Sequence, residues 1–216
     1  MRALRKVKIK WSPDFAYAIG LLTTDGSLSS DGRHMNLTSK ARGLIEIFKT
    51  CLGLKNKIGR KMRKGGGEKR YFQLQFGDVY FYRFLLKLGL TPNKSKTLSE
   101  IYIPKQYFFD FLRGHFDGDG TFYSYWDPRW KSSFMFYTVF TSASRSHILW
   151  LRRKIREQLS INGHITKDKK KTLYQLKYAK WESLKLLEKL YVHSRVYLPR
   201  KYLKITKALA IIGKHI

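Results

Sequence analysis

The chain has 216 residues and a formal net charge of +29, because 44 Lys and Arg residues stand against 15 Asp and Glu. A charge of this size destabilises a folded chain through self-repulsion, and DNA or RNA is the simplest partner that would offset it. Hydrophobic residues make up 43% of the chain, which excludes a disordered basic arm. On charge alone, a ribosomal or chromatin protein that only coats nucleic acid stays open.

The cysteine count and the hydropathy bear on where the protein works. Cys51 is the single cysteine, which excludes an internal disulfide and suggests a reducing compartment. No secretory signal is visible, and no apolar run approaches the length that spans a bilayer. We therefore expect a soluble intracellular protein, in the cytoplasm or nucleoid or in an organelle such as a mitochondrion or chloroplast.

Helix and strand signals alternate in a regular order along the first half. Pro13 and Asp14 suit a helix start, and this helix is predicted to end at Asp25-Gly26. Asp31-Gly32 is a strong hairpin dipeptide between two strands. The other elements expected in this half are a helix at 41–52, a hairpin at 58–76 turning at 65–67, and a helix at 79–88.

The second half repeats this order. A helix is predicted from about Phe108, followed by strands at 121–141, a helix at 146–159, a hairpin at 165–178, a helix at 181–191 and a final helix from Lys201. The sequences also match, since segments 15–28, 37–48, 71–76 and 90–98 are echoed in order by 108–122, 140–151, 173–178 and 197–205. Four matched segments in one order indicate an internal duplication. We place the two halves at 1–98 and 107–216, joined by a linker at 99–106.

The second hairpin of each half alternates between apolar and polar residues. In the first half, Phe72, Leu74 and Phe76 share one strand face, and the second half does the same with Tyr174, Leu176 and Tyr178. The opposite face carries Gln73, Gln75, Gln175 and Lys177. One sheet face is therefore predicted to be buried. The other is polar and basic and suits a DNA groove, although an ordinary solvated face has the same pattern.

Two helices of matched sequence resemble the motif of one nuclease family. Ala18–Gly26 (AIGLLTTDG) and Leu112–Gly120 (LRGHFDGDG) each end in Asp-Gly and open a repeat. They resemble the LAGLIDADG motif of homing endonucleases (meganucleases), in the single-chain form with two motifs. The resemblance implies an α+β fold of two pseudo-symmetric αββαββα halves, with antiparallel saddle-shaped sheets that bind DNA and motif helices packed at the central interface.

The spacing of small residues in the two motifs suits close helix packing. The small residues that would lie at this helix interface are Ala16, Gly20, Thr24, Gly114 and Gly118. If the two helices pack, Asp25 and Asp119 leave the same end of the pair, and their mutual repulsion favours a divalent cation between them.

The resemblance also implies a reaction, the hydrolysis of one phosphodiester in each strand of a long asymmetric DNA duplex by metal-activated water. Asp25 and Asp119 are the expected metal ligands and so belong to the catalytic residues. The expected cofactor is Mg²⁺ or Mn²⁺, with Ca²⁺ binding without supporting cleavage. Lys94 and Lys201 occupy matched positions and are expected to stabilise the transition-state charge or to tune the attacking water, although a lysine in so basic a chain can also be a plain phosphate contact.

Bases would be read by side chains on the outward strand faces and their turns, since Arg suits guanine and Asn or Gln suits adenine. The candidates are Ser29, Arg33, Asn36, Arg63, Arg70, Gln73 and Gln75 in the first half and Tyr123, Arg129, Lys131, Lys169, Gln175 and Lys177 in the second.

Some residues depart from the pattern of the family. Thr23 stands where the second motif has Asp117, and we do not interpret this as loss of function. Arg113 and His115 are polar for a packing helix and are expected to point away from the helix pair, toward solvent or the flanking strands. The aromatic residues Tyr125, Trp126 and Trp130 are expected to form a packing cluster at a strand end rather than to stack on bases.

Other functions remain open at this point. One chain that carries both halves needs no dimer, so we expect a monomer. The alternatives are an RNA maturase with intron RNA as its partner, a DNA-binding regulator that does not cleave, and a basic structural protein. The last does not explain the paired motifs.

Overall fold

Packing divides the chain into two compact units. In the computed structural model, which describes residues 5–62, 71–168 and 172–216, unit 1 comprises Met1–Lys94 and Ile101–Gly118, and unit 2 comprises Ser95–Glu100 and Asp119–Ile216. This division follows contacts within the fold, whereas the predicted halves follow the sequence repeat. The halves at 1–98 and 107–216 with their linker at 99–106 therefore stay a prediction. The second motif helix packs with the first half of the chain.

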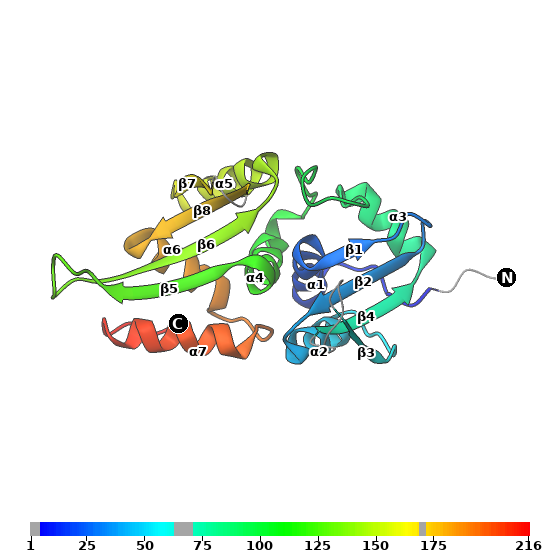
Figure 1. Cartoon of the computed structure of the whole chain (residues 1–216), viewed down its shortest axis with the longest axis horizontal. Helices are drawn as coiled ribbons and strands as arrows, with labels where there is room; N and C mark the ends of the chain where they lie inside the picture. The colour runs from blue at the N-terminus through cyan, green and yellow to red at the C-terminus, as the bar shows by residue number, and fades with distance from the viewer. Residues whose placement is uncertain (1–4, 63–70, 169–171) are drawn as a thin grey trace. The chain divides into compact units, whose positions relative to one another are not determined.

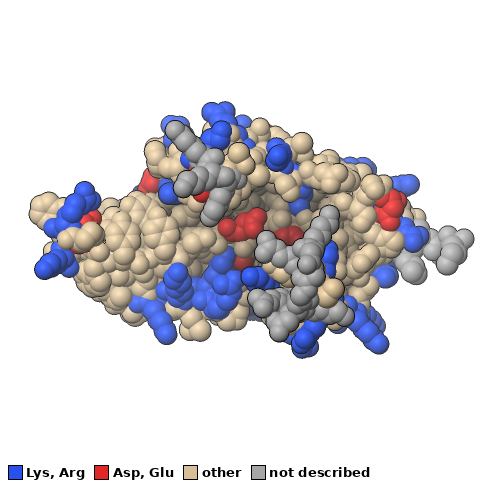
Figure 2. All heavy atoms as spheres, in the orientation of Figure 1, with Lys and Arg blue, Asp and Glu red and all other residues tan. Residues whose placement is uncertain are grey.

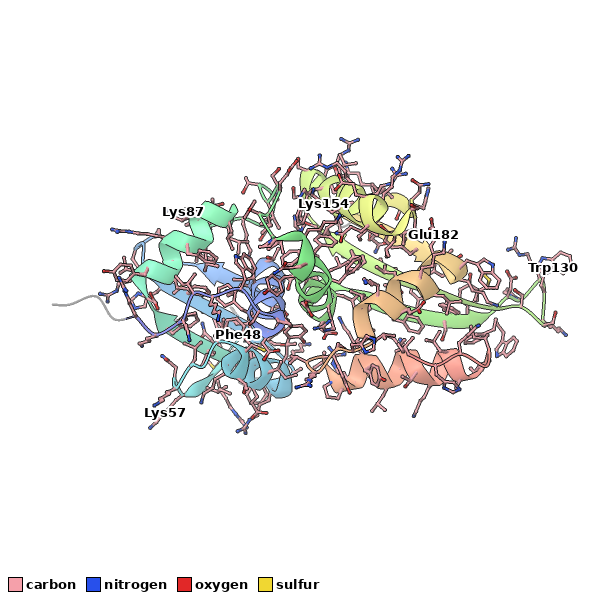
Figure 3. The ribbon with its side chains drawn as sticks, turned by 180° about the vertical axis from the view of Figure 1, so that it is seen from behind. Phe48, Lys57, Lys87, Trp130, Lys154 and Glu182 are labelled. Carbon is pink, nitrogen blue, oxygen red and sulfur yellow. The ribbon has the colours of Figure 1, made fainter. Side chains whose placement is uncertain are left out.

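Unit 1 is built on a four-stranded antiparallel sheet with helices on one face (Figures 1 and 3). Its strand order is β1-β2-β4-β3. Its elements are α1 (Pro13–Thr24), β1 (Gly26–Leu28), β2 (His34–Ser39), α2 (Arg42–Cys51), β3 (Ile58–Lys61), β4 (Tyr71–Gly77), α3 (Val79–Leu88), the short 3₁₀ helix η1 (Lys105–Tyr107), and α4 (Phe108–Asp119) up to Gly118.

Unit 2 repeats the same topology. Its sheet has the order β5-β6-β8-β7, which is the order of unit 1 shifted by four strands. Its elements are β5 (Thr121–Trp126), β6 (Phe134–Ser142), α5 (Arg145–Leu159), β7 (His164–Asp168), β8 (Leu173–Ala179), α6 (Lys180–Tyr191) and α7 (Pro199–Ala210). The α+β fold class and the duplicated helix–hairpin order expected from the sequence are confirmed. The predicted turn at 65–67 lies outside the described residues.

Local signals explain where the helices begin and end. Ser12 caps α1 by accepting a hydrogen bond from the Phe15 amide, and Pro13 opens the first turn. Asp78 caps α3 through the Phe81 amide and also accepts hydrogen bonds from the amides of residues 6 and 7, which anchors the segment before α1. The final helix begins at Pro199 rather than at Lys201, because proline is favoured at the first helical position.

Burial follows the alternation of the strands. In β4, Leu74 and Phe76 are buried while Gln75 is exposed. In β8, Leu176 and Tyr178 are fully buried, whereas Lys177 between them is only half-buried. The helices of each unit cover one apolar face of its own sheet, so the other face of each sheet is open.

The segment Ser95–Glu100 belongs to unit 2 although it precedes α4 in the chain. Its backbone carbonyls at 98 and 99 contact the Ser144 hydroxyl and His147 Nδ1, the latter at 2.7 Å, and Glu100 pairs with Arg153 at 2.7 Å. All three partners belong to α5 or its N-cap. The chain therefore passes between the two units more than once.

Helices α1 and α4 pack with their backbones almost in contact. A Cβ atom added to Gly20 would lie 2.1 Å from the carbonyl oxygen of Phe111, and one added to Gly114 would lie 2.0 Å from that of Tyr17. A Cβ on Gly118 would lie 2.0 Å from the Thr24 hydroxyl. These separations are far below van der Waals contact, so only glycine fits at the three positions. Ala16, the remaining small residue predicted for the interface, is fully buried.

We predict that Gly20→Ala destabilises the protein by about 1–3 kcal/mol or more, because the added methyl group must push two helix backbones apart. Urea unfolding followed by circular dichroism measures the change. Gly43→Ala is the matched control, since a Cβ at Gly43 in α2 meets nothing within 4 Å. The control is expected to gain about 0.5–1 kcal/mol from helix propensity. Equal unfolding midpoints for the two variants would contradict the backbone contact.

Candidate metal and nucleic-acid site

Each motif aspartate lies where its helix ends and the first strand of a sheet begins. Asp25 caps α1, with its amide bonded to the Leu21 carbonyl at 3.0 Å, and β1 begins at the next residue. Asp119 is the last residue of α4, and β5 begins at Thr121. The residues just before the two aspartates, Thr24 and Gly118, contact each other within unit 1.

The electrostatics of these helix ends are unusual for so basic a chain. The C-terminal end of a helix carries a partial negative charge, which favours Lys or Arg in the last turn and disfavours acids. Every other α-helix of the described residues has a basic residue in its last turn, whereas α1 and α4 have none. Two helices that end in Asp without a basic residue of their own favour a cation from elsewhere.

A lysine reaches the same backbone atom in each repeat. The Nζ of Lys94 donates to the carbonyl oxygen of Gly26, and the Nζ of Lys201 donates to that of Gly120 at 2.6 Å. Gly26 and Gly120 are the glycines that follow the two motif aspartates. Lys94 lies in a turn after Asn93, whose φ is 56°, while Lys201 lies in the first turn of α7. The matched positions in the sequence therefore correspond to matched contacts.

A buried polar contact joins the two motif helices. The Tyr17 hydroxyl on α1 donates to Asp117 Oδ2 on α4 at 2.7 Å, and both residues are buried. Thr23, at the position equivalent to Asp117, instead donates to the Ile19 carbonyl of its own helix at 2.8 Å. The extra acid of the second motif thus has a partner on the first motif helix, which sequence reasoning missed.

Arg113 corrects one expectation. Arg113 and His115 were expected to point away from the helix pair, toward solvent or the flanking strands. Burial rules out solvent for both, since Arg113 is 3% and His115 is 1% exposed, and Arg113 contacts the partner helix. Arg113 bonds Asp110 at 2.7 Å, and its guanidinium lies 5.7 Å from the centre of the Tyr17 ring. An ion pair one turn away and an aromatic face on α1 allow the charge to be buried.

The predicted base-reading residues divide into three groups. The first group lies on the open sheet faces. In unit 1, Asn36 on β2 pairs with Gln75 on β4, and at the equivalent place in unit 2, Val139 on β6 pairs with Lys177 on β8. Its members are Asn36, Gln73 and Gln75 in unit 1 and Tyr123, Gln175 and Lys177 in unit 2. The second group, Ser29, Arg33, Arg129 and Lys131, lies in the turns that follow β1 and β5. The third group, Arg63, Arg70 and Lys169, lies outside the described residues.

Some of these side chains already have partners. The Asn36 amide donates to the Ser27 hydroxyl at 3.0 Å. The Arg129 guanidinium bonds Asp127 at 3.2 Å, and hydrogen bonding from Arg129 holds the pKa of Asp127 below its usual range. In the other hairpin turn, hydrogen bonds from His34 lower the pKa of Asp31 in the same way. Both loop carboxylates are therefore ionised at neutral pH.

The aromatic cluster predicted near the end of β5 is not a packed one. Trp130 is 70% exposed at the tip of the β5–β6 hairpin, and Trp126 is 53% exposed although its ring contacts Phe134 (Figure 3). Tyr125 instead lies on the open sheet face beside Tyr123 and Tyr137. The alternation of residues along β5 does not specify how β5 is aligned with β6. This alignment brings the three tyrosine rings together.

The chemistry of the donors suits a hard cation such as Mg²⁺ or Mn²⁺, which binds a few carboxylates with phosphate and water oxygens. Within residues 5–62, 71–168 and 172–216, no group of three or more His, Cys, Asp and Glu side chains could hold a metal by itself. No helix of this described part is long and apolar enough to cross a membrane.

A family model and several solved structures are similar to this chain. The family described as the LAGLIDADG-like domain matches residues 12–89, so the first repeat has the sequence character of that family. This confirms the resemblance inferred from the two motifs. No curated protein sequence matches the chain.

Solved structures share the fold over nearly the whole chain. The homing endonuclease I-WcaI bound to its DNA recognition sequence has a TM-score of 0.65 at 13% identity, over 92% of this chain and 88% of its own. I-DmoI in complex with DNA and Mn has a TM-score of 0.53 at 16% identity, over 85% and 98%. Full-length DUF199/WhiA from Thermatoga maritima has a TM-score of 0.58 at 15% identity; this chain is covered to 97% but spans only 64% of WhiA. The chain thus has the LAGLIDADG fold.

We predict that Tyr17→Phe lowers the free energy of unfolding by about 1.5–3 kcal/mol, because it removes a hydrogen bond to a buried carboxylate. Urea denaturation is the measurement. Tyr102→Phe is the control, since Tyr102 is 71% exposed. If both variants unfold at the same denaturant concentration as the parent protein, the contact with Asp117 contributes nothing to stability.

Proposed function

We propose that the protein is a site-specific endonuclease that binds a long, asymmetric DNA duplex and hydrolyses one phosphodiester in each strand with a divalent metal. One observation carries the proposal. Each repeat ends its motif helix in Asp-Gly and brings a lysine onto the carbonyl of that glycine, Lys94 in unit 1 and Lys201 in unit 2. If each repeat cleaves one strand of the DNA, each repeat needs its own aspartate and lysine.

Each residue of this set has a distinct part in the proposed reaction. Asp25 and Asp119 hold the metal, which when bound lowers the pKa of water and offsets negative charge on the attacked phosphate. Lys94 and Lys201 are held by backbone carbonyls close to the aspartates of their own repeats, where a positive charge stabilises the developing phosphorane. Tyr17 and Asp117 act as positioning residues that fix the rotation of α1 against α4.

The open sheet faces provide the DNA-binding surface in this proposal. The major groove admits antiparallel strands, and amide side chains such as Gln73, Gln75 and Gln175 match the hydrogen-bonding edge of adenine. The net charge of +29 supplies affinity for phosphate. The likeness to DNA-bound I-WcaI and to I-DmoI in complex with DNA and Mn supports both the partner and the metal.

The second candidate is a DNA-binding regulator that does not cleave. The likeness to WhiA favours it, because the fold is shared by that protein as well as by homing endonucleases. The two candidates differ in what they ask of the aspartates and lysines. A regulator needs neither the metal nor the paired Asp-Gly ends.

Cleavage by Asp25→Asn and Asp119→Asn variants tests the metal site. Each is expected to lose double-strand cleavage while DNA binding stays within about twofold, because the amide is a poorer ligand for Mg²⁺ but keeps the shape of the side chain. The assay sequences the ends produced from a randomised duplex library, with Mg²⁺ and with EDTA. Full activity of both variants would overturn the assignment. Binding of one sequence by the parent protein without any cut ends would favour the regulator.

The lysines are tested separately with Lys94→Met and Lys201→Met. Methionine keeps the apolar stem of the lysine side chain, which matters because Lys94 is only 6% exposed. Single-turnover cleavage is expected to slow about a hundredfold in each, with little change in binding. Lys87→Met and Lys185→Met, at exposed positions on α3 and α6, are the controls. A loss of binding equal to the loss of rate would make Lys94 and Lys201 phosphate contacts only.

A further inference from the structure

The open face of the unit 2 sheet is divided into two chemically different parts. Toward β7 and β8 it is polar, with His164 paired to Lys177 and Thr166 paired to Gln175. Toward β5 and β6 it is aromatic and apolar, with Tyr123 opposite Tyr137 and Tyr125 opposite Met135. In the following text, Tyr123, Tyr125 and Tyr137 are called the tyrosine cluster.

The tyrosine cluster is an ordered surface rather than a set of independent rings. The three ring centres lie 5.2, 6.4 and 6.5 Å apart, and their planes are within 18° of parallel. Burial raises the pKa of Tyr123 and of Tyr137, and a hydrogen bond with Tyr125 adds to the effect at Tyr137. The hydroxyl groups of Tyr123 and Tyr137 are therefore neutral. The Tyr125 side chain remains 40% exposed.

The equivalent surface of unit 1 is polar. Ser29 follows Asp25 by four residues, as Tyr123 follows Asp119. His34 lies opposite Ser29 as Tyr137 lies opposite Tyr123, and Asn36 lies opposite Ser27 as the buried Val139 lies opposite Thr121. The neighbouring positions on the next strand keep their polarity, since Gln73 corresponds to Gln175. On β5 and β6 the second repeat thus has aromatic or aliphatic side chains where the first repeat has hydrogen-bonding ones.

Basic residues border this apolar surface. Figure 2 shows the surface over β5 and β6 largely in tan, with Lys and Arg gathered along its margins. Arg129 and Lys131 are exposed in the loop after β5, and Lys177 lies on the open face two strands away. A ligand for this surface must be a polyanion that also presents an apolar group. In the major groove of DNA, the one apolar group on a base edge is the 5-methyl group of thymine.

We propose that the tyrosine cluster and Met135 recognise thymine by its 5-methyl groups, in the part of the DNA target that lies against β5 and β6. This inference rests on the proposed DNA-binding function and specifies which base is preferred at one end of the target. Unit 1 selects bases through hydrogen bonds from amides, whereas this part of unit 2 selects them through apolar contact. The same contact also discriminates against duplex RNA, because uracil lacks the methyl group.

Selection from two randomised duplex libraries tests the inference, one synthesised with thymidine and the other with deoxyuridine. The two libraries differ only in the 5-methyl group. The parent protein is incubated with each in EDTA, and bound duplexes are sequenced. We expect thymine to be enriched at one end of the selected site, and this enrichment to disappear in the deoxyuridine library while the rest of the site is unchanged.

The same sequence from both libraries would overturn the inference and leave the proposed function standing. No enriched sequence in either library would overturn both. The two failures are therefore distinguishable.

A variant then assigns the contact to the tyrosine cluster. In the selected duplex, replacing one recognised thymine by deoxyuridine is expected to weaken binding by the parent protein about fourfold, the contribution of one buried methyl group. In Tyr125→Ser, this thymine-to-uracil ratio is expected to fall to about one, as a coupled pair requires. Gln75→Ala, on the unit 1 sheet, is the matched control and keeps the fourfold ratio. A fourfold ratio retained in Tyr125→Ser would overturn the role of the tyrosine cluster.

Discussion

The rest of the structure depends on a contact that contains almost no side chain, the one between α1 and α4. At Gly20, Gly114 and Gly118 each helix takes up space where a Cβ of the other would stand. Such an approach fixes both the distance between the helices and their rotation, because a small slide would bring a larger residue into the contact. The hydrogen bond between Tyr17 and Asp117 is satisfied only in this register. The position of each helix end, and with it that of Asp25, follows from packing farther up the helices.

The placement of positive charge is selective despite its abundance. Lysine and arginine neutralise the C-terminal ends of the other helices in the described residues but are absent from the last turns of α1 and α4. Lys94 and Lys201 bring positive charge from other segments to the glycines that follow these two helix ends. A group brought in from a different element can be positioned independently of the helix, which suits a role in chemistry better than a role in capping.

The internal repeat explains why so much of the fold could be predicted from the sequence. Every strand and helix predicted in the first half has a counterpart in the second, and alternation in β4 and β8 identifies the buried face. Contacts between elements were less accessible. The burial of Arg113 depends on Tyr17, 96 positions earlier, and no local pattern reports that pairing. The tyrosine cluster depends on the register of β5 against β6, which the length of the intervening loop sets.

The interleaved path of the chain has a consequence for its synthesis. Unit 1 requires α4, so the first repeat cannot complete its packing until the ribosome has made the chain as far as Gly118. By then Ser95–Glu100 has also been made, but its partners Ser144, His147 and Arg153 have not. During synthesis there is thus a stage in which all residues of unit 1 have been made, while this six-residue segment still lacks its partners in α5. Domains generally fold as units from the N-terminal side. Here the order of translation and the order of assembly differ by one short segment, Ser95–Glu100. A truncation after residue 98 would remove α4, the helix that α1 packs against.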